Sequence, residues 1–194
     1  MESMESYLVI VVSAIFINNI VLSRFLGICP FLGVSRSITT AVGMGGAVLF
    51  VMTVATLVTF LLHHFLLIPL GITYLQTVAY ILIIAFLVQV VEIVLKKVSP
   101  DLYQALGVFL PLITTNCAIL GVAILVIQQD FTLMESVVFA ISNALGFTLA
   151  IVLFSSLRGQ LERSELPPAM KGVPAALIIA GILSMAFMGF AGLV

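Results

Sequence analysis

Charged residues are scarce in this 194-residue chain. Asp, Glu, Lys and Arg together make up 8% of it, against about 25% in an ordinary soluble domain. A water-soluble fold of this length could not cover its surface with so few polar groups. The seven Lys and Arg are also scattered, and the formal net charge is -1, so the chain lacks the basic footprint that nucleic-acid binding needs. The sequence therefore predicts an integral membrane protein and excludes a nucleic-acid-binding function.

Long hydrophobic runs take the place of charge. Hydrophobic residues make up 63% of the chain, and its mean hydropathy is +1.37. Since a membrane-spanning helix needs about 20 mostly apolar residues, we predict an all-α protein with six transmembrane helices in one domain, residues 1–194. These helices cover residues 7–34, 39–62, 73–95, 103–127, 133–157 and 174–193. The acidic N-terminal MESMES lacks the basic n-region of a cleavable signal peptide, so we expect the first span to be retained.

Basic residues fall on one side of the expected membrane. With six spans, the first, third and fifth loops share a side. All seven basic residues lie in or beside these loops: Arg24, Arg36, Lys96, Lys97, Arg158, Arg163 and Lys171. Because cytoplasmic loops collect Lys and Arg, the sequence predicts that these loops are cytoplasmic and that both termini lie outside.

A short motif recurs in the two halves of the chain. Residues 29–34 read CPFLGV and residues 117–122 read CAILGV, and two further spans follow each copy. Three spans per copy is an odd number, so the second copy enters the membrane from the opposite side. The pattern predicts two inverted three-helix repeats, over about 7–95 and about 101–193, with a working site near the bilayer midplane.

Helix-breaking residues surround the cysteine in both copies. Proline removes a backbone hydrogen bond from a helix, and glycine loosens it. At membrane depth such backbone persists only where protein or a cavity satisfies it. We therefore predict that the first and fourth transmembrane helices are broken. The breaking and polar residues beside Cys29 and Cys117 are Gly27, Pro30 and Gly33 in the first copy, and Gly107, Pro111, Thr114, Thr115, Asn116 and Gly121 in the second.

The residues alone leave three interpretations of Cys29 and Cys117 open. A free cysteine in an apolar setting behaves as a small hydrophobic residue. A disulfide would need access to an oxidising compartment. The third interpretation is metal ligation, but an iron–sulfur cluster normally takes four thiolates and this chain has two cysteines. A second subunit would have to supply the missing pair, because His63 and His64 are expected at the far side of the membrane.

Other polar residues are expected at membrane depth. Capping of the broken helices is favoured over an ion path or hydrogen bonds to a cofactor for Asn18, Asn19, Thr114, Thr115 and Asn116. Gln89 and Glu92 lie one helical turn apart, and we favour an ordinary Glu92–Lys96 pair over an ion site. Ser142, Asn143 and Gly146 are typical of close helix contact. Arg24 has no definite role at this level: it either snorkels to the interface or offsets the charge of a bound group.

Four stretches carry a resemblance to a known family: FLGICPFLGVS (25–35), LYQALGVFLPLITTNCAILGVA (102–123), LPPAMKGVPAALIIAG (166–181) and SMAFMGFAGL (184–193). Together they resemble the Rnf/Nqr membrane-subunit superfamily, and within it the A subunits of Rnf complexes, the ion-translocating ferredoxin:NAD oxidoreductases of bacteria. The resemblance runs over nearly the whole chain. It is weaker to the E subunit of the sodium-pumping NADH:quinone oxidoreductase, which the motif LPLITTNCA also fits.

The resemblance implies a cofactor and a partner. In that family two cysteines, here Cys29 and Cys117, join two from a homologous membrane protein of opposite orientation, the E subunit of Rnf, to hold a [2Fe-2S] cluster within the membrane. Gly27 and Pro30 would then break the first helix so that a thiolate points toward the axis shared by the two proteins. Other Rnf subunits carry iron–sulfur clusters and flavins, and the complex lies in the bacterial inner (cytoplasmic) membrane.

The resemblance thus implies an electron-relay subunit of a redox-driven ion pump. One-electron transfer needs no catalytic acid, base or nucleophile, and the sequence offers none. Two alternatives remain: the E subunit of the sodium-pumping oxidoreductase, and an inverted-repeat transporter of small solutes that holds no cofactor. A metal centre with its own absorbance band and EPR signal distinguishes the redox hypothesis from the transporter.

Overall fold

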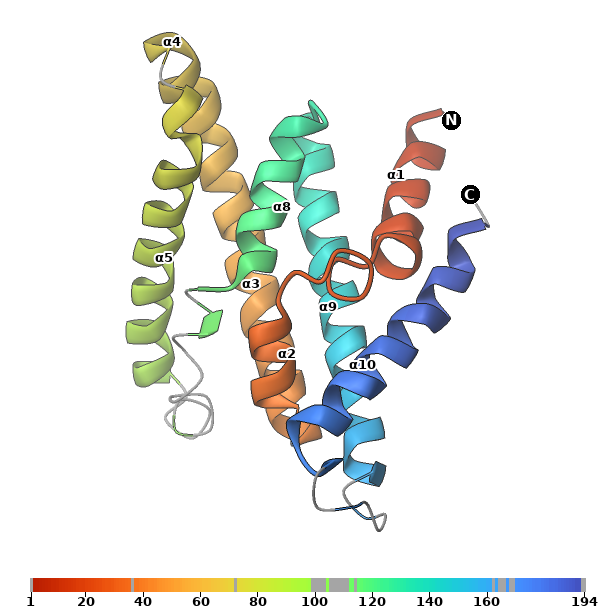
Figure 1. Ribbon diagram of the computed structural model, residues 1–194. Helices are drawn as coiled ribbons and strands as arrows, with labels where there is room; N and C mark the ends of the chain where they lie inside the picture. Colours follow the sequence, from red (N-terminus) through yellow and green to blue (C-terminus); the bar gives the residue numbers. More distant parts are fainter. Residues whose placement is uncertain are drawn as a thin grey trace.

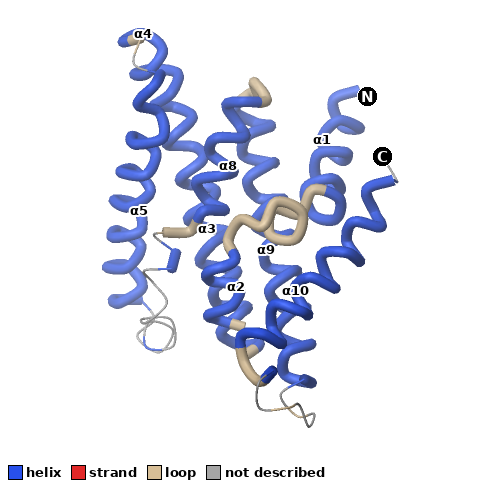
Figure 2. Tube along the Cα trace, viewed as in Figure 1, coloured by secondary structure: helices blue, strands red, loops and turns tan. Residues whose placement is uncertain are grey.

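The computed structural model describes residues 2–35, 37–71, 73–98, 112–113, 115–161 and 170–192, with the single residues 104, 163 and 167. Every regular element in these residues is helical (Figures 1 and 2), which confirms the predicted all-α class. Three described helical stretches are long and apolar enough to cross a membrane, and shorter apolar helices accompany them. The long stretches are Ile38–Leu70, Gln76–Val94 and Leu133–Leu161, and the shorter ones are Tyr7–Ile17, Cys117–Gln128 and Val173–Met188.

The elements follow the predicted order of spans. The first half contains α1 (Glu2–Val12), the π-helix η1 (Ser13–Ile17), α2 (Ile28–Val34), α3 (Ile38–Leu62), the π-helix η2 (His63–Leu67), α4 (Ile68–Leu70), the short 3₁₀ helix η3 (Thr73–Leu75) and α5 (Gln76–Val98). The second contains α8 (Cys117–Gln128), α9 (Leu133–Leu161), α10 (Val173–Met188) and the 3₁₀ helix η5 (Gly189–Gly192). The short lengths of α2 and α8 agree with broken first and fourth spans.

The two halves run in opposite directions (Figure 1). In this view α2 descends, α3 ascends and α5 descends, whereas α8 ascends, α9 descends and α10 ascends. The chain enters with α1 and leaves after α10 at the same end of the molecule. This arrangement is the one that two inverted three-helix repeats predict, and it places α1 and α2 in a single interrupted crossing.

Helix α9 forms the centre of the bundle. In its most apolar stretch half of the residues are buried, against 17% in that of α5. The buried face of α9 includes Phe147, Ile151 and Phe154. Its contact with α3 is close, because a Cβ added at Gly45 would lie 2.5 Å from Cγ2 of Thr148. Hydroxyl groups on α9 bond to the carbonyl four residues earlier, as Ser142 does to Val138 at 2.7 Å. These hydroxyl groups are thereby satisfied within the helix, as a low-dielectric surrounding favours, whereas the buried hydroxyl of Ser155 has no hydrogen-bond partner in the described residues.

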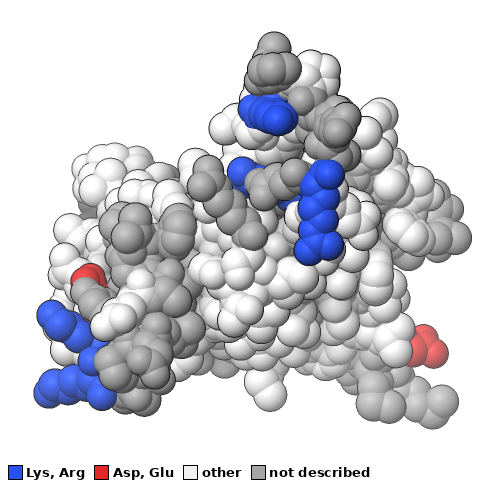
Figure 3. Space-filling model, turned by 90° about the horizontal axis from the view of Figure 1, so that it is seen from below, with Lys and Arg blue, Asp and Glu red and all other residues white. Residues whose placement is uncertain are grey.

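Basic side chains gather at one end of the molecule (Figure 3). Lys96 and Lys97 end α5, Arg158 lies in the last turn of α9, and the termini lie at the opposite end. Two of the basic residues predicted to lie in or beside the loops have other surroundings. Arg158 is 7% exposed and buried beside α2, and Arg24 lies within the break of the first span. Arg36 lies outside the described residues.

Candidate cofactor-binding site at the two helix breaks

The first break follows a widening of the helix. Helix α1 passes into η1, where the backbone N–H of Asn18 donates to the carbonyl of Ser13 at 2.7 Å, and the Asn18 amide donates to the Ser13 hydroxyl at 3.1 Å. The chain then leaves the helix until α2 begins at Ile28. Phe25 and Gly27 adopt positive φ angles of 55° and 85°. Glycine accepts this conformation without the clash of a Cβ, so Gly27 permits the sharp entry into α2.

Asn19 fixes this break to the centre of the bundle. Its side chain is fully buried, and its Nδ2 donates to the carbonyls of Ile15 at 3.0 Å and Gly146 at 2.9 Å. Its Oδ1 accepts from the backbone N–H groups of Val21 at 3.1 Å and Leu22 at 3.4 Å. A Cβ at Gly146 would lie 3.1 Å from this amide nitrogen. The structure thus gives Asn19 a capping role and Gly146 a close contact between helices.

The second break ends in a capped helix. Asn116 is the N-cap of α8, and its Oδ1 accepts from the backbone N–H of Ala118 at 3.0 Å. Its Nδ2 is buried and has no hydrogen-bond partner within the described part of the chain. Thr115 is exposed. Gly107, Pro111 and Thr114, which are also predicted to break or polarise this span, lie outside the described residues. Gly121 lies within α8 and does not interrupt it.

The two breaks contact each other at the cysteine of the second. The backbone N–H of Gly27 donates to Sγ of Cys117 at 2.9 Å. A Cβ built on Gly27 would lie 3.2 Å from Oδ1 of Asn116 and from Cβ of Ala118, so the start of α2 touches the start of α8. Cys29 is the second residue of α2 and Cys117 the first of α8. Both thiols therefore lie in the first turn of half-helices that run in opposite directions (Figure 1).

The structure tests two of the three interpretations of the cysteines, a disulfide and metal ligation. Both are free, Cys29 exposed and Cys117 half-buried, so the disulfide alternative is wrong. Within the described residues no three His, Cys, Asp or Glu side chains group closely enough to hold a metal ion. His63 and His64 begin η2, at the end of α3 remote from α2. Any centre with four thiolate ligands would need two of them from another chain.

The surroundings of Cys117 suit an anionic, sulfur-rich group. One backbone donor already points at its sulfur, and the unpartnered Nδ2 of Asn116 belongs to the neighbouring residue. Buried donors without partners cost free energy, and iron–sulfur clusters accept hydrogen bonds at their sulfur atoms. The amides at the start of α8 add partial positive charge. The residues present therefore fit a cluster in which this chain supplies two ligands.

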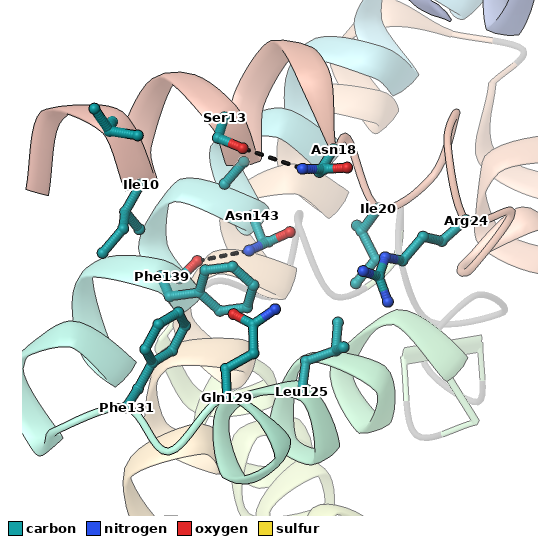
Figure 4. A pocket seen from close by; sticks show the side chains of 12 residues that line it. Ile10, Ser13, Asn18, Ile20, Arg24, Leu125, Gln129, Phe131, Phe139 and Asn143 are labelled. Carbon is teal, nitrogen blue, oxygen red and sulfur yellow. Dashed lines mark hydrogen bonds between the residues drawn. The ribbon is translucent and has the colours of Figure 1, made fainter. Parts of the chain in front are cut away.

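Asn18 and Arg24 lie at a different place from the cysteines. They line a cavity of about 160 Å³ between η1, α8 and α9, together with Val9, Ile10, Ser13, Ala14, Ile20, Leu125, Gln129, Phe131, Phe139 and Asn143. Figure 4 shows the Arg24 guanidinium and the Gln129 amide directed into this space. Sequence reasoning grouped Asn18 with the cysteines and missed Ser13 and Gln129, since their approach depends on how α1 and α8 pack.

The remaining predicted residues have local roles or exposed positions. The amide of Asn143 donates to the carbonyl of Phe139 at 2.8 Å, one turn earlier on α9. Gln89 is exposed and Glu92 half-buried on α5, the least buried of the long helices. Pro30 is buried in the first turn of α2, where a proline lacks no intrahelical hydrogen bond.

The fold and site define a class: a multi-pass membrane protein with two broken helices, α2 and α8, that each carry a cysteine in the first turn. Comparison with known proteins identifies the family, because residues 7–194 match the family model described as Rnf-Nqr subunit, membrane protein. The chain belongs to this family.

Relatives align over almost the full length of the chain. It is similar to the A subunit of the Na(+)-translocating ferredoxin:NAD(+) oxidoreductase complex of Acetobacterium woodii, with 59% identity over 95% of this chain and 96% of the relative. The A subunit of the ion-translocating oxidoreductase complex of Syntrophotalea carbinolica is 57% identical, and that of Aeromonas salmonicida 50%, each over 98% of this chain and 99% of the relative.

Proposed function

We propose that this chain is the A subunit of an ion-translocating ferredoxin:NAD oxidoreductase complex and acts there as a membrane electron relay. In this proposal Cys29 and Cys117 supply two thiolate ligands to a [2Fe-2S] cluster, and a homologous membrane protein of opposite orientation, the E subunit of Rnf, supplies the other two. The observation that carries the proposal is the 2.9 Å hydrogen bond from Gly27 N–H to Cys117 Sγ. It joins the two breaks at the sulfur of one proposed ligand.

The chain's own residues do the positioning. When bound, the cluster supplies one-electron oxidation and reduction. Asn19 holds the first break against α9, Asn116 caps α8, and Gly27 brings the start of α2 against Cys117. Cys29 is exposed, so its thiol is open to a second protein. This difference in exposure supports a centre completed from outside the chain.

The names of the relatives favour the A subunit over the alternatives. Relatives between 50% and 59% identical over nearly the whole chain are named as A subunits of ion-translocating oxidoreductase complexes. A solute transporter would use a polar cavity and leave the two thiols without a role. A cavity beside the first break is lined by Asn18, Ile20 and Arg24 but by neither cysteine, so a solute bound there would not account for Cys29 and Cys117.

The proposal also covers location and partners. The basic end formed by α5 and α9 would face the cytoplasm by the positive-inside rule, and both termini would then lie on the outer side of the bacterial inner membrane. Iron–sulfur and flavin subunits of the same complex would then deliver and remove electrons. Exposed lysines such as Lys96 and Lys97 suit docking of acidic redox partners.

Two serine substitutions test the proposal in the assembled complex. Cys29→Ser and Cys117→Ser should each remove one EPR signal and its share of the iron while the subunits still copurify. Loss of ferredoxin-driven, ion-coupled NAD reduction should follow. Ser37→Cys, which adds a thiol outside the site, is the control and should keep the signal. A complex that retains every EPR signal and full activity in both variants would contradict the proposal.

A further inference from the structure

Arg158 lies where a loop residue was expected but has a buried guanidinium. Its exposed fraction is 7%. Its Nη1 donates to the carbonyl of Leu32 at 2.9 Å and to the hydroxyl of Ser35 at 2.9 Å. Leu32 lies in α2, and Ser35 is the C-cap of that helix. An arginine from the fifth span therefore closes the end of the half-helix that carries Cys29.

Two other contacts also join α9 to the stretch from Gly27 to the end of α2. Phe147 lies at the start, where its ring would meet a Cβ on Gly27 at 3.1 Å. Phe154 lies in the middle and stacks on Phe31 with ring centroids 4.2 Å apart. Arg158 lies one turn further along α9. A single face of α9 thus supports α2 from its first turn to its C-cap.

Helix α2 depends on this support. It has seven residues, and isolated helices shorter than about 12 residues are marginal even with favourable sequences. The last carbonyls of a helix have no partner within it and carry partial negative charge. The Arg158 guanidinium supplies both a donor and a positive charge at that end, in a surrounding where an unpaired carbonyl is costly.

We propose that Arg158 is a positioning residue for Cys29. It fixes the axis and height of α2, and so sets where the Cys29 thiol lies relative to Cys117. Leu32 follows Cys29 by three residues, a rise of about 4.5 Å, so the bonded carbonyl lies one turn from the thiol-bearing residue. The same positive charge favours a reduced, more negative group held by Cys29. This inference rests on the proposed function for its redox part and on the chain's own geometry for the rest.

Arginine suits this position better than lysine. Its planar guanidinium presents several donors in fixed directions and remains charged, so one group meets a carbonyl and a hydroxyl together. A lysine would keep the charge but not this geometry. The substitutions Arg158→Lys and Arg158→Leu therefore separate position from charge. Arg163→Leu is the matched control, because Arg163 is exposed near the same end of α9.

The experiment compares these variants in the purified complex by EPR, redox titration and iron content. In Arg158→Leu we expect the occupancy of the centre that depends on Cys29 to fall roughly tenfold, as when groups that orient metal ligands are removed, and its remaining signal to broaden and titrate at a more negative potential. Arg158→Lys keeps the charge but not the geometry, so its potential should be close to that of the unsubstituted complex while its signal stays broadened. Arg163→Leu should match the unsubstituted complex in both. An unchanged signal, line shape and potential in Arg158→Leu would overturn the inference while leaving the proposed function intact.

Two further measurements cover the remaining outcomes. If Arg158→Leu prevents assembly, Ser35→Ala removes one of the two bonded acceptors and should give a smaller shift of the same signal; an unchanged signal there overturns the inference. If no EPR signal depends on Cys29, the proposed function fails, and positioning is tested by alkylation of Cys29 in a Cys117→Ser complex. Faster alkylation in Arg158→Leu than in Arg163→Leu supports positioning, and equal rates contradict it.

Discussion

The two helix breaks place a cysteine in the first turn of α2 and of α8 by different means. The first break extends from Asn18 to Gly27, follows a π-helix, contains two residues with positive φ and leads into a seven-residue helix. The second ends in an N-cap, Asn116, and leads into a helix of 12 residues. The first cysteine is exposed, and the second is half-buried with a backbone donor on its sulfur.

The two breaks differ in the contacts that hold the cysteine-bearing helix in place. Helix α8 carries its own cap, and half-buried Cys117 receives its hydrogen bond from within the chain. Helix α2 has a glycine at its N-cap without a side-chain hydrogen bond, so its position comes from packing against α3 and from its contacts with α9. The second half of the site therefore has a local cap in addition to its long-range contacts, whereas the first depends on long-range contacts alone and presents its thiol outward. Substitutions in the first break should accordingly disturb the site more than those in the second.

Gly27 should be the most sensitive position, because both breaks meet there. A Cβ would lie 3.1 Å from the ring of Phe147, and the φ angle of 85° disfavours any other residue. We expect Gly27→Ala to destabilise the protein by about 3 kcal/mol, from left-handed backbone strain and overpacking together. Gly71→Ala is the control: its φ is 67° with nothing within 4 Å, so it should cost about 1 kcal/mol. Unfolding of the detergent-solubilised complex measures both, and equal losses would show that the breaks do not meet tightly.

Of the two capping asparagines, Asn19 in the first break should contribute more to stability than Asn116 in the second. Asn19→Ala removes four hydrogen bonds, one of them to α9, and should cost about 2 to 3 kcal/mol at roughly 1 kcal/mol per net bond for most of them. Asn116→Ala removes one N-cap bond and should cost about 1 kcal/mol. The same unfolding measurement ranks them. A larger loss at Asn116 would reverse the proposed difference between the breaks.

Sequence reasoning found the breaks but not what holds them. Glycine and proline act on the local backbone, so the interruptions near Cys29 and Cys117 could be predicted from them. The long apolar runs predicted the all-helical class, and the repeated motif predicted the opposed directions of the two halves. Asn18 and Asn19 are adjacent and looked equivalent, yet Asn19 is buried against Gly146 and Asn18 faces a cavity. Arg158 counted as a loop charge because its partner, the end of α2, is remote in sequence. Such roles depend on which face of α9 packs against the first break and α2, and a local sequence pattern does not specify that packing.

Gly146 and Gly159 on α9 test whether the first break packs tightly against this helix. A Cβ there would lie 3.1 Å from the carbonyl oxygen of Ala14 and from the amide of Asn19, so Gly146→Ala should push the first break outward and cost about 1 to 3 kcal/mol. Gly159 lies on the same helix with nothing within 4 Å. Gly159→Ala should therefore stabilise by up to about 1 kcal/mol through helix propensity. Unfolding of the two variants under the same conditions tests this. Similar changes in the free energy of unfolding would mean that the first break does not pack tightly against α9.

Asn116→Ser should have the smallest effect on stability and the most specific one on the site. Serine caps a helix about as well as asparagine, so the free energy of unfolding should change by less than about 0.5 kcal/mol. The substitution also removes the buried Nδ2, which has no partner in the described residues. If that donor serves a cluster held by Cys117, its loss leaves negative charge less stabilised, and the centre should titrate at a more negative potential. Redox titration followed by EPR checks this, with Thr115→Ser, at an exposed neighbour, as the control. An unchanged potential in Asn116→Ser would mean that the second break positions Cys117 without tuning it, and Gly27 N–H would remain as the donor to that sulfur.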